Sequence, residues 1–543
     1  MTKLKIAILT DSDELQAWEF ACLQAILDQN LAELVLEIRT KSPKSSGKKS
    51  PWFYRIYRGL DRRLFGSKHD AFFKLKINSL SKSEIPVLEV SPIQTTYRDE
   101  FSRSALDQIG KSKPDLILRF GFRILTGGIL TLPRLGVWSF HHGDPDYYRG
   151  GPPAFWEVMN AKPITGVVLQ QLTEKLDQGK VLYSSFSQTD PLSVDRNANR
   201  IFWKSAFFPL RVLQQIELIG EEAWQNSLEQ QSPEGNPVSP LLRPPTTLSM
   251  LFLLGSLVSR NVVRKIKALT KKPHWEIGYL NQNEFDWNTN TVPKNPILLP
   301  VAEPITSYLA DPFPVEYRGD TFLFYEDFDK KTQKGRIGCG KLTETGLSNQ
   351  KLVLEEDWHL SYPFSFEQDG EHFLIPESAD KGRIYRYRAR NFPYEWEKGG
   401  VFFPFEGYDP TILRYDNKYW LFINQRLHPG ISPFDELFLY WCTDFLNPVW
   451  HAHPLNPIVS DVRFSRPAGA IFLEGKRLIR PAQDSGLRYG HQVIFREIKK
   501  LTETEYQEEP IGILSAAGVK GALGVHTFNQ AGGKVFLDFY HRR

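Results

Sequence analysis

The residues best suited to chemistry gather just after a short apolar run, Leu135 to Phe140, which predicts a buried strand. His141 and His142 follow the run directly. Because open α/β sheets bind ligands at strand ends, we expect this strand to deliver His141 to a crevice. A histidine near its unperturbed pKa of about 6.5 exchanges protons at neutral pH, and a carboxylate such as Asp177 can orient the ring and stabilise the imidazolium. The two side chains predict general acid and base chemistry.

A loop shaped by glycine and proline follows, from Tyr148 to Pro153. We expect it to lie over the site, with Arg149 placed to contact an anion or a carbonyl group. Taken singly these signals are weak, because a lone histidine at a strand end is more often a structural residue and Asp-x-Gly is common in turns. Their combination in one short region favours a functional site.

Four motifs occur in a fixed order in this region: His141, Arg149-Gly150, Thr165 to Val167 and Leu176 to Gly179. In this order they resemble the amino-terminal catalytic domain of the folate-dependent formyltransferases, which move a formyl group from 10-formyltetrahydrofolate to an amine. That family shows Asn-x-His, Arg-Gly, Thr-Gly-Val and Leu-Asp-x-Gly. One position departs from the pattern, since Ser139 stands in place of the family's asparagine.

The resemblance implies catalytic roles for His141, Asp177 and Ser139. Asp177 would hold His141 and relay protons, and His141 with Ser139 would stabilise the tetrahedral intermediate as the acceptor amine attacks the formyl carbon. No metal is required. Losing an oxyanion donor costs about a hundred- to a thousand-fold in rate, but Ser139 still offers one hydroxyl donor. Retained catalysis is therefore expected, and a catalytically weakened domain is the alternative.

The same resemblance implies where the donor and the substrate bind. The pterin of 10-formyltetrahydrofolate would lie against the loop after Phe120 and against the backbone between Leu172 and Asp177. The residues expected to bind this cofactor are Phe122, Arg123, Ile124, Leu172 and Thr173. Substrate contacts are expected from His142 and Arg149.

The whole chain has 543 residues, of which 41% are hydrophobic and 24% charged, so it is expected to form two or three globular units. Its formal net charge of +4 is small for this length and argues against a nucleic-acid partner. The three cysteines lie far apart, so neither a disulfide framework nor a zinc site is indicated. The amino terminus shows no export signal, and the apolar run Met250 to Val258 is shorter than the roughly 20 residues of a membrane span. A cytoplasmic protein without an integral membrane segment is expected, and its oligomeric state stays open.

Strand-like and helix-like segments alternate from Leu4 to about Ser187, which predicts an α/β Rossmann-like domain with a mostly parallel sheet. The alternation places strands at 4–9, 33–38, 86–90, 115–120 and 136–140, and helices at 13–29, 97–109 and 126–132. The predicted domains are residues 1–228, a linker with a connecting helix at 229–273, and residues 274–543.

An insertion between Arg39 and His69 interleaves basic and aromatic residues, among them Trp52, Arg55 and Arg63. Such a pattern suits a phosphate-bearing or lipid-headgroup substrate. A solvated helix surface is the alternative explanation.

Beyond Trp275 the sequence is typical of β structure, with short aromatic and β-branched runs between turn residues. Five copies of a motif recur about every 50 residues and predict an all-β five-bladed propeller. The copies begin at Leu309, Leu360, Gly407, Phe464 and Gly524. The pattern resembles the glycoside hydrolase clan of arabinanases and fructosidases, and more closely the propeller at the amino end of plant glucosamine inositolphosphorylceramide transferases.

Glycosidases of that clan use carboxylates from different blades, and Asp311 and Asp409 match two of these, so both are expected to bind substrate. The general acid expected in the fourth blade has no counterpart, because Arg466 occupies the equivalent start. An inverting hydrolase needs both an acid and a base. A sugar-binding or scaffolding propeller is therefore favoured over a working glycosidase.

The leading hypothesis is an N-formyltransferase that acts on an amino sugar, either nucleotide-linked or part of a glycan or glycolipid, with folate and sugar as its small-molecule partners. The propeller would recognise carbohydrate. A formyltransferase for tRNA is disfavoured, because the propeller replaces the small basic β-barrel of those proteins. The alternatives are a carbohydrate-binding protein with a weakened first domain and, less favoured, a glycosidase centred on Asp311 and Asp409.

Overall fold

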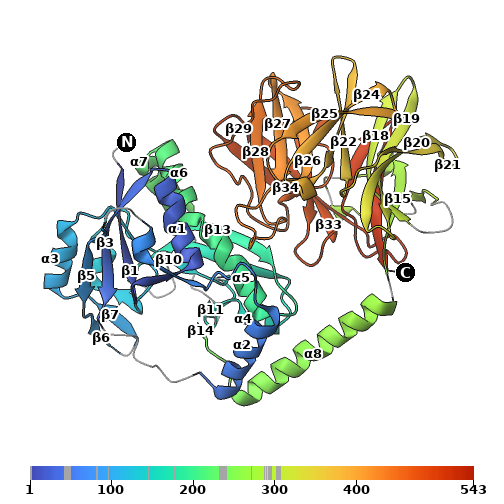
Figure 1. The fold of residues 1–543 in the computed structure, drawn as a ribbon. Coiled ribbons are helices and arrows are strands. Elements are labelled where there is room, and N and C mark those ends of the chain that lie inside the picture. The colour runs from blue at the N-terminus through green and yellow to red at the C-terminus, as the bar shows by residue number, and fades with distance from the viewer. Residues whose placement is uncertain are drawn as a thin grey trace. The chain divides into compact units, whose positions relative to one another are not determined.

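The computed structural model describes residues 3–41, 50–80, 84–95, 97–144, 146–174, 179–231, 241–270, 272–286, 288, 290–291, 296–300 and 307–542. The chain divides into two compact units (Figure 1). Unit 1 comprises Met1–Val262 with His428–Ser432, and unit 2 comprises Val263–Leu427 with Pro433–Arg543. The division falls inside helix α8 (Thr247–Thr270), within the segment expected to connect the domains.

Unit 1 is built on a seven-stranded sheet with the order β13-β12-β10-β8-β1-β3-β5. Its strands are β1 (Leu4–Thr10), β3 (Ala32–Thr40), β5 (Val87–Val90), β8 (Leu116–Arg119), β10 (Val137–His141), β12 (Ile164–Gln171) and β13 (Lys180–Gln188). Neighbours from β10 to β5 run parallel, whereas β12 and β13 pair antiparallel at one edge. The predicted Rossmann-like, mostly parallel sheet is confirmed.

Helices cover both faces of this sheet because the central strands are apolar on both sides. Ile6 and Ile8 of β1 pack in a cluster with α1, α5, α6 and α7, while Ala7 and Leu9 pack in a second cluster with α3. The helices are α1 (Ala17–Asp28), α2 (Trp52–Phe65), α3 (Arg103–Lys111), α4 (Phe155–Met159), α5 (Val194–Ser205), α6 (Phe208–Ile219) and α7 (Glu221–Gln231). Short strands complete the unit: β2 (Glu14–Gln16), β4 (Lys74–Lys76), β6 (Ile93–Gln94), β7 (Arg98–Glu100), β9 (Ile124–Thr126), β11 (Arg149–Gly150) and β14 (Leu241–Leu242).

Two helices expected from the sequence are shorter in the structure. The segment 97–109 begins as strand β7, and α3 starts only after Ser102, whose side chain accepts a hydrogen bond from the Ala105 N–H at 3.3 Å as an N-cap. The segment 126–132 forms only a 3-10 turn, Gly127–Leu130. Its two adjacent glycines disfavour a longer helix.

Unit 2 is all β and contains five sheets among its described residues, which confirms the predicted class. The first sheet holds β18 (Ser307–Tyr317), β19 (Asp320–Asp329), β20 (Lys334–Thr343) and β21 (Gly346–Leu354); the second holds β22 (Ser361–Gln368), β23 (Glu371–Glu377), β24 (Ile384–Asn391) and β25 (Glu395–Phe403). The third holds β26 (Tyr408–Tyr415), β27 (Lys418–Asn424), β28 (Leu437–Cys442) and β29 (His451–Ala452). The fourth holds β16 (Asn290–Thr291), β30 (Arg466–Pro467), β31 (Phe472–Glu474), β32 (Arg477–Asp484), β33 (Gln492–Leu501) and β34 (Tyr506–Ser515). The fifth holds β15 (Pro273–Asn281), β17 (Ile297–Leu298), β35 (Phe528–Ala531) and β36 (Lys534–Arg542).

These sheets form a closed ring, the arrangement of a propeller. Strands β18, β22, β26 and β30 contact one another in succession, and β15 and β36 contact β18. The ring closes because β15, the first strand of the unit, pairs antiparallel with β36 at its end.

The sequence repeat marks a bulge at the same place in three sheets. Asp311, Tyr362 and Asp409 each precede a proline and adopt positive φ angles of 50°, 46° and 49°. The pairing register shifts at each of these residues. Each bulge turns the end of its innermost strand and re-aims the side chain there.

Among the described residues, no helix combines the length and the apolar character needed to cross a membrane.

Candidate functional site

A cavity of about 140 Å³ lies at the carboxyl ends of β8 and β10 in unit 1. These strands are parallel neighbours, and their register places Arg119 opposite Ser139. Carboxyl ends of strands are where open α/β sheets bind ligands. The residues lining the cavity are Arg98, Arg119, Ile124, Leu125, Thr126, Ser139, Phe140, His141, Gln170, Leu172, Thr173, Glu174 and Gly179.

Arg119 organises one wall of this cavity. Its Nη1 donates to the Ser139 hydroxyl at 2.9 Å, and its Nη2 donates to the backbone oxygens of Phe122 and Arg123, each at 3.0 Å. Burial lowers the pKa of the guanidinium from its ordinary value, although Asp11 and Asp99 counteract this. The Arg119 Nε is buried and has no hydrogen-bond partner among the described residues. The wall therefore carries a poorly solvated positive charge.

His141 ends strand β10 and lines the same cavity. Its Nε2 lies 3.0 Å from the backbone oxygen of Tyr148. Because a carbonyl oxygen only accepts, this contact places a proton on Nε2, and a neutral ring then keeps its lone pair on Nδ1. Ser139 lies two residues earlier on the same strand and is 2% exposed. The structure thus brings together two of the three predicted catalytic residues.

The third, Asp177, lies outside the described residues. It falls in the segment 175–178, between Glu174 and Gly179. Both of these residues line the cavity. Its pairing with His141 stays a prediction.

His142 lies away from this cavity. Its Nε2 lies 3.0 Å from the Ser205 hydroxyl, and its ring stacks on Phe202 at a centroid distance of 3.5 Å. Burial holds the pKa of His142 well below its ordinary value, and His141 lowers it further. Successive strand residues point to opposite faces, so β10 separates the two histidines.

The glycines of the sequence motifs bring backbone segments close together. A side chain on Gly166 would place its Cβ 3.1 Å from the Cα of Asp144. Gly150 has a φ of +86°, and a Cβ there would lie 2.4 Å from the Leu242 oxygen. That contact belongs to the parallel pair β11–β14, which also carries Arg149. Arg149 is half-buried and is not among the residues lining the cavity.

Three of the five residues predicted to bind the formyl donor line the cavity, namely Ile124, Leu172 and Thr173. The other two lie behind its wall. Phe122 is 3% exposed and packs in the core, and its N–H donates to Asp11 at 2.7 Å. The Arg123 side chain turns to Asp99, with Nη2 2.7 Å from Oδ1. Phe122 and Arg123 contribute to the site only through their backbone oxygens, which accept hydrogen bonds from Arg119.

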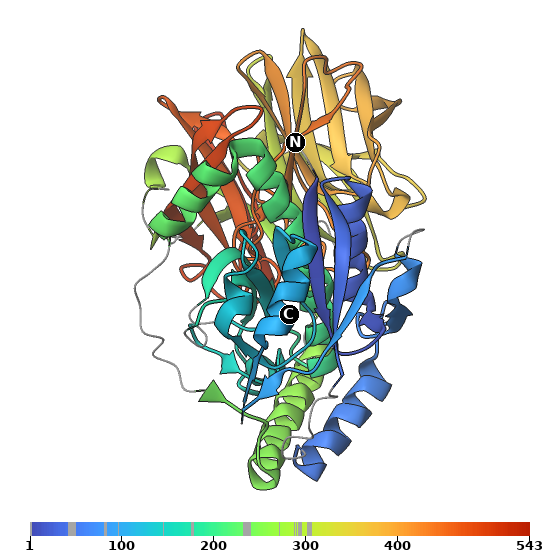
Figure 2. The same cartoon turned by 90° about the vertical axis from the view of Figure 1, so that its left-hand side faces the viewer.

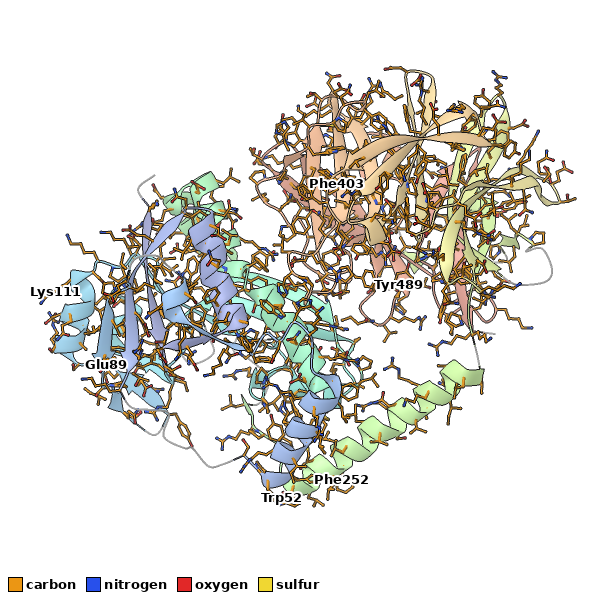
Figure 3. All side chains as sticks on the ribbon, viewed as in Figure 1. Trp52, Glu89, Lys111, Phe252, Phe403 and Tyr489 are labelled. Carbon is orange, nitrogen blue, oxygen red and sulfur yellow. The ribbon has the colours of Figure 1, made fainter. Side chains whose placement is uncertain are left out.

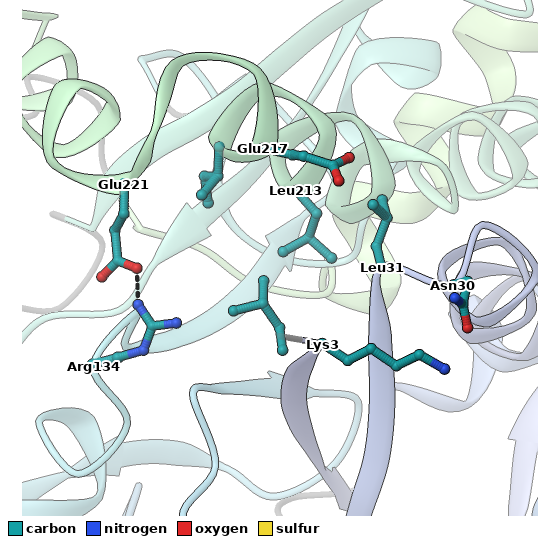
Figure 4. Close-up of a pocket in the computed structure, with 9 residues that line it drawn as sticks. Lys3, Asn30, Leu31, Arg134, Leu213, Glu217 and Glu221 are labelled. Carbon is teal, nitrogen blue, oxygen red and sulfur yellow. Dashed lines mark ion pairs between the residues drawn. The ribbon is translucent and has the colours of Figure 1, made fainter. Parts of the chain in front are cut away.

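A larger cavity of about 350 Å³ lies at the opposite end of the sheet (Figure 4). It opens beside Leu4 and Leu31, at the amino ends of β1 and β3, and is bounded by Leu213 and Glu217 of α6. An ion pair between Arg134 and Glu221 crosses its edge. Because it lies at the amino ends of the strands, away from His141, we assign the chemistry to the smaller cavity.

In unit 2, Asp311 is buried and each of its carboxylate oxygens accepts a hydrogen bond from a protein group. Its Oδ2 accepts the Tyr362 N–H and its Oδ1 accepts the Thr527 hydroxyl, both at 3.0 Å. His526 approaches Oδ1 at 3.5 Å. Burial raises the pKa of Asp311 to about 6, opposed by the charge of His526.

Asp409 is also buried and is held by Arg466. The guanidinium forms a bidentate pair with its carboxylate, with Nη2 3.0 Å from Oδ1, and Gln483 donates to Oδ2 at 3.2 Å. Arg466 also lies 3.7 Å from Glu377 and stacks over Tyr489, which Figure 3 labels. The arginine at the start of the fourth sheet thus neutralises the carboxylate that a glycosidase would need.

Asp311, His526 and Asp538 lie close enough to hold a metal ion, with one atom of each within 4.8 Å of the others. Protein donors already occupy this cluster. His526 Nδ1 lies 2.7 Å from Asp538 Oδ2, and Asp538 Oδ1 accepts the N–H groups of His526 and Thr527 at 3.1 and 3.0 Å. The cluster therefore ties the first sheet to its neighbour, the fifth sheet, by hydrogen bonds.

Two groups of polar residues were missed from the sequence. One is Arg119, which follows the apolar run Leu116 to Leu118. The available signal was a charged residue at the end of a predicted buried strand. Glu326 and Glu377 lie within buried strands of unit 2, where burial and neighbouring carboxylates raise the pKa of each well above its ordinary value. No sequence pattern in these strands indicates that the two carboxylates converge.

The comparisons with protein families match both units. Residues 67–196 match the model described as formyl transferase, and residues 287–529 match that of glucosamine inositolphosphorylceramide transferase 1, N-terminal. Solved structures that match parts of the chain include a phosphoribosylglycinamide formyltransferase from Bacillus Halodurans, with 12% identity and a TM-score of 0.28 over 40% of this chain and 98% of that one. Another is Zg3597, a family 117 glycoside hydrolase from Zobellia galactanivorans, with 14% identity and a TM-score of 0.33 over 49% and 90%.

The curated relatives are of the same two kinds as the matching family models. Glucosamine inositolphosphorylceramide transferase 1 from Oryza sativa subsp. japonica is 36% identical over 221 residues, which is 40% of this chain and 29% of that protein. Bifunctional polymyxin resistance protein ArnA from Wigglesworthia glossinidia brevipalpis is 40% identical over 78 residues, 14% of this chain and 12% of that protein. Methionyl-tRNA formyltransferase from Chlorobium limicola is 32% identical over 90 residues, 17% and 27%. The chain therefore spans less than a third of the length of each of these relatives. Both predicted resemblances are confirmed: the chain joins a region similar to formyl transferases to one similar to the amino-terminal region of glucosamine inositolphosphorylceramide transferases.

Proposed function

We propose that this protein is an N-formyltransferase that moves a formyl group from 10-formyltetrahydrofolate to the amine of an amino sugar, while unit 2 recognises carbohydrate. The observation that carries the proposal is the cavity at the carboxyl ends of β8 and β10, where Arg119, Ser139 and His141 meet. The relatives agree with an amino sugar as acceptor. Some are named as formyltransferases, and others carry glucosamine in their name.

The cavity suits the reacting end of a folate. Ile124, Leu125 and Leu172 offer apolar surface for a flat ring, and Thr126 and Thr173 offer polar edges. Its volume of about 140 Å³ is smaller than the about 300–1,000 Å³ typical of ligand pockets. We therefore expect only the formyl-bearing end to enter, with the rest of the donor outside.

The chemistry divides among four side chains. When bound, the donor supplies a formyl carbon as the electrophile. A new bond forms between that carbon and the acceptor nitrogen, the bond from the carbon to the donor nitrogen breaks, and one proton passes from the acceptor nitrogen to the donor nitrogen. His141 carries the proton, with Asp177 orienting its ring. The Ser139 hydroxyl and the Arg119 charge stabilise the negative charge that develops on the formyl oxygen.

The test is a product assay with purified protein, 10-formyltetrahydrofolate and a panel of free, nucleotide-linked and lipid-linked amino sugars. We expect one acceptor to gain the mass of a formyl group as tetrahydrofolate is released. His141→Asn should lower kcat/KM by about a hundred- to ten-thousand-fold. His451→Asn, an exposed histidine of unit 2, is the matched control and should leave the rate unchanged. Equal rates in the parent and His141→Asn would refute the assignment.

A second candidate is a carbohydrate-binding protein whose first unit no longer turns over. The observation that favours it is Ser139, which is buried and already accepts a hydrogen bond from Arg119. This candidate predicts sugar binding without formyl transfer to any acceptor. Equilibrium binding to a glycan panel, run beside the product assay, separates the two functions.

A further inference from the structure

Helix α2 has two apolar faces, and only one of them is covered. Tyr54 and Tyr57 pack edge-on against Phe155, and Asp61 is buried, where it accepts the Asp195 N–H at 2.8 Å. These contacts fix the helix on unit 1. The opposite face carries a stripe of exposed large side chains at every fourth position: Trp52, Ile56, Leu60 and Leu64.

Helix α8 repeats this arrangement. Met250 and Leu257 are buried in the same apolar cluster that receives Tyr54 and Tyr57 from α2. Arg260 secures the helix to unit 1 by donating to the backbone oxygens of Val158 and Met159 at 3.0 and 3.1 Å. Its outer side exposes Leu248, Leu251, Phe252, Val258 and Val262.

The two helices that carry the exposed stripes lie beside each other. Both helices pack on the shared cluster around Phe155 and Met159. Trp52 and Phe252 lie next to each other at the same end of unit 1 in Figure 3, and the two helices lie together at that end in Figure 2 as well. Trp52 is 62% exposed and Phe252 is 73% exposed. Large exposed apolar patches of this kind mark interaction sites.

Basic residues accompany the apolar stripes. Helix α2 carries four arginines and a single acid, the buried Asp61, and α8 carries four basic residues and no acid. The rest of the chain must therefore be net negative, because the whole chain has a formal charge of only +4. On α2 the exposed basic residues are Arg55, Arg62 and Arg63, of which Arg62 pairs with Asp70 at 2.6 Å. The exposed Arg264, Lys265 and Lys267 lie in the carboxyl-terminal part of α8, beyond the proposed surface.

We propose that α2 and the amino-terminal part of α8 form a docking surface for an anionic lipid bilayer. Helices that lie in a membrane interface combine Trp, Phe and Leu on one side with Lys and Arg at its borders, which is the composition found here. The apolar stripes would enter the acyl boundary, and the basic residues would contact anionic headgroups. The surface would hold the protein beside a lipid-linked substrate without spanning the membrane.

The test is co-sedimentation of the full-length protein with vesicles, in the absence of any formyl donor or acceptor, so that its outcome is independent of the proposed catalysis. One set of vesicles is phosphatidylcholine alone, and the other contains phosphatidylserine as well. We expect binding to the anionic vesicles, weaker binding at high salt, and little binding to the neutral ones.

Two double variants separate the apolar and charged contributions. Trp52→Ser with Phe252→Ser should lower binding at least tenfold, and Arg55→Glu with Arg63→Glu should do the same. Phe405→Ser with Leu473→Ser, which removes exposed apolar side chains from unit 2, is the matched control and should bind like the parent. Circular dichroism confirms that each variant is folded, as expected for exposed positions.

Three results would overturn the proposal. One is absence of parent binding to anionic vesicles, and another is equal binding by parent and both double variants. The third is a parent dimer that the Trp52→Ser and Phe252→Ser changes dissociate without any vesicle binding, which would make the face an interface between two copies. Light scattering of the same samples detects that last outcome.

Discussion

The two units treat their buried polar groups in opposite ways. In unit 1, Arg119, Ser139 and His141 border a cavity. At the centre of unit 2, protein groups donate hydrogen bonds to the carboxylates of Asp311 and Asp409, and the positive charge of Arg466 neutralises Asp409. A carboxylate that already accepts protein hydrogen bonds or pairs with an arginine is less available to a substrate than a group that borders a cavity. This difference supports the proposal that unit 1 carries the catalysis and that the polar centre of unit 2 is structural.

The largest effect is expected from Arg466→Met in unit 2. The change leaves the buried carboxylates of Asp409 and Glu377 without their cation, which costs about 3–5 kcal/mol of the free energy of unfolding. Denaturant unfolding followed by circular dichroism measures it. Arg463→Met is the matched control, because the Arg463 pair with Asp461 is partly exposed and is worth at most about 1 kcal/mol. Similar losses in both variants would show that the Arg466 pair is not a structural tie.

In unit 1, Arg119→Met should lower the rate of formyl transfer. Because the change also removes the donor to the Phe122 and Arg123 oxygens, circular dichroism checks that the variant is folded. A donor to a developing oxyanion is worth about a hundred- to a thousand-fold in kcat. Arg119→Lys should restore little, since one ammonium cannot reach Ser139 and two backbone oxygens in the same geometry. Arg134→Met, at the opposite end of the sheet, controls for loss of an arginine and should keep its kcat. An Arg119→Met rate within threefold of the parent would remove Arg119 from the site.

Glu157 predicts how the stability of unit 1 depends on pH. Its carboxyl is 2% exposed, and burial raises the pKa of Glu157 to about 7, with a further contribution from Asp144. The unfolded chain releases this proton near its ordinary pKa of 4.5, so stability falls as pH rises from about 4.5 to about 7 and is level above that. Glu157→Gln should remove this loss and gain up to about 3 kcal/mol at pH 8 relative to pH 4.5.

The measurement is the free energy of unfolding of both proteins across that pH range. Glu217→Gln, on the exposed side of α6, is the control and should follow the parent curve. If the Glu157→Gln curve runs parallel to the parent's, folding does not raise the pKa of the Glu157 carboxyl, and the prediction is wrong.

The smallest effect is expected from Ser139→Ala, which removes one hydroxyl beside Arg119. We expect about a tenfold loss of kcat, equivalent to about 1.4 kcal/mol. In the Arg119→Met background the same change should cost much less, because the two groups act together through their 2.9 Å contact. Additive losses would show that Ser139 and Arg119 act independently.

The sequence predicted the strands of unit 1 because apolar runs such as Leu135 to Phe140 define them with little ambiguity. It predicted His141 at the cavity for the same reason, since β10 ends there. The sequence did not predict that, of the two histidines, only His141 lines the cavity while His142 packs against α5. The direction of each side chain depends on which face of the strand meets the helices, and the sequence does not state this. Arg119 escaped notice because its role depends on the register between β8 and β10.

In unit 2 the repeat predicted the all-β ring and placed Asp311 and Asp409 on equivalent strands. It could not show what surrounds these carboxylates. Arg466 lies 57 residues from Asp409, and Thr527 lies 216 residues from Asp311. Such contacts follow from the closed ring. The polar centre is therefore a property of the fold and not of any one motif.

The most direct test of the central claim is calorimetric titration of the protein with a stable analogue of 10-formyltetrahydrofolate, comparing the parent with His141→Ala and Asp177→Asn. We predict saturable binding to the parent and weaker binding to both variants, as required if the cavity at the ends of β8 and β10 holds the formyl donor. Absence of binding to the parent, or equal binding to all three proteins, would contradict the claim.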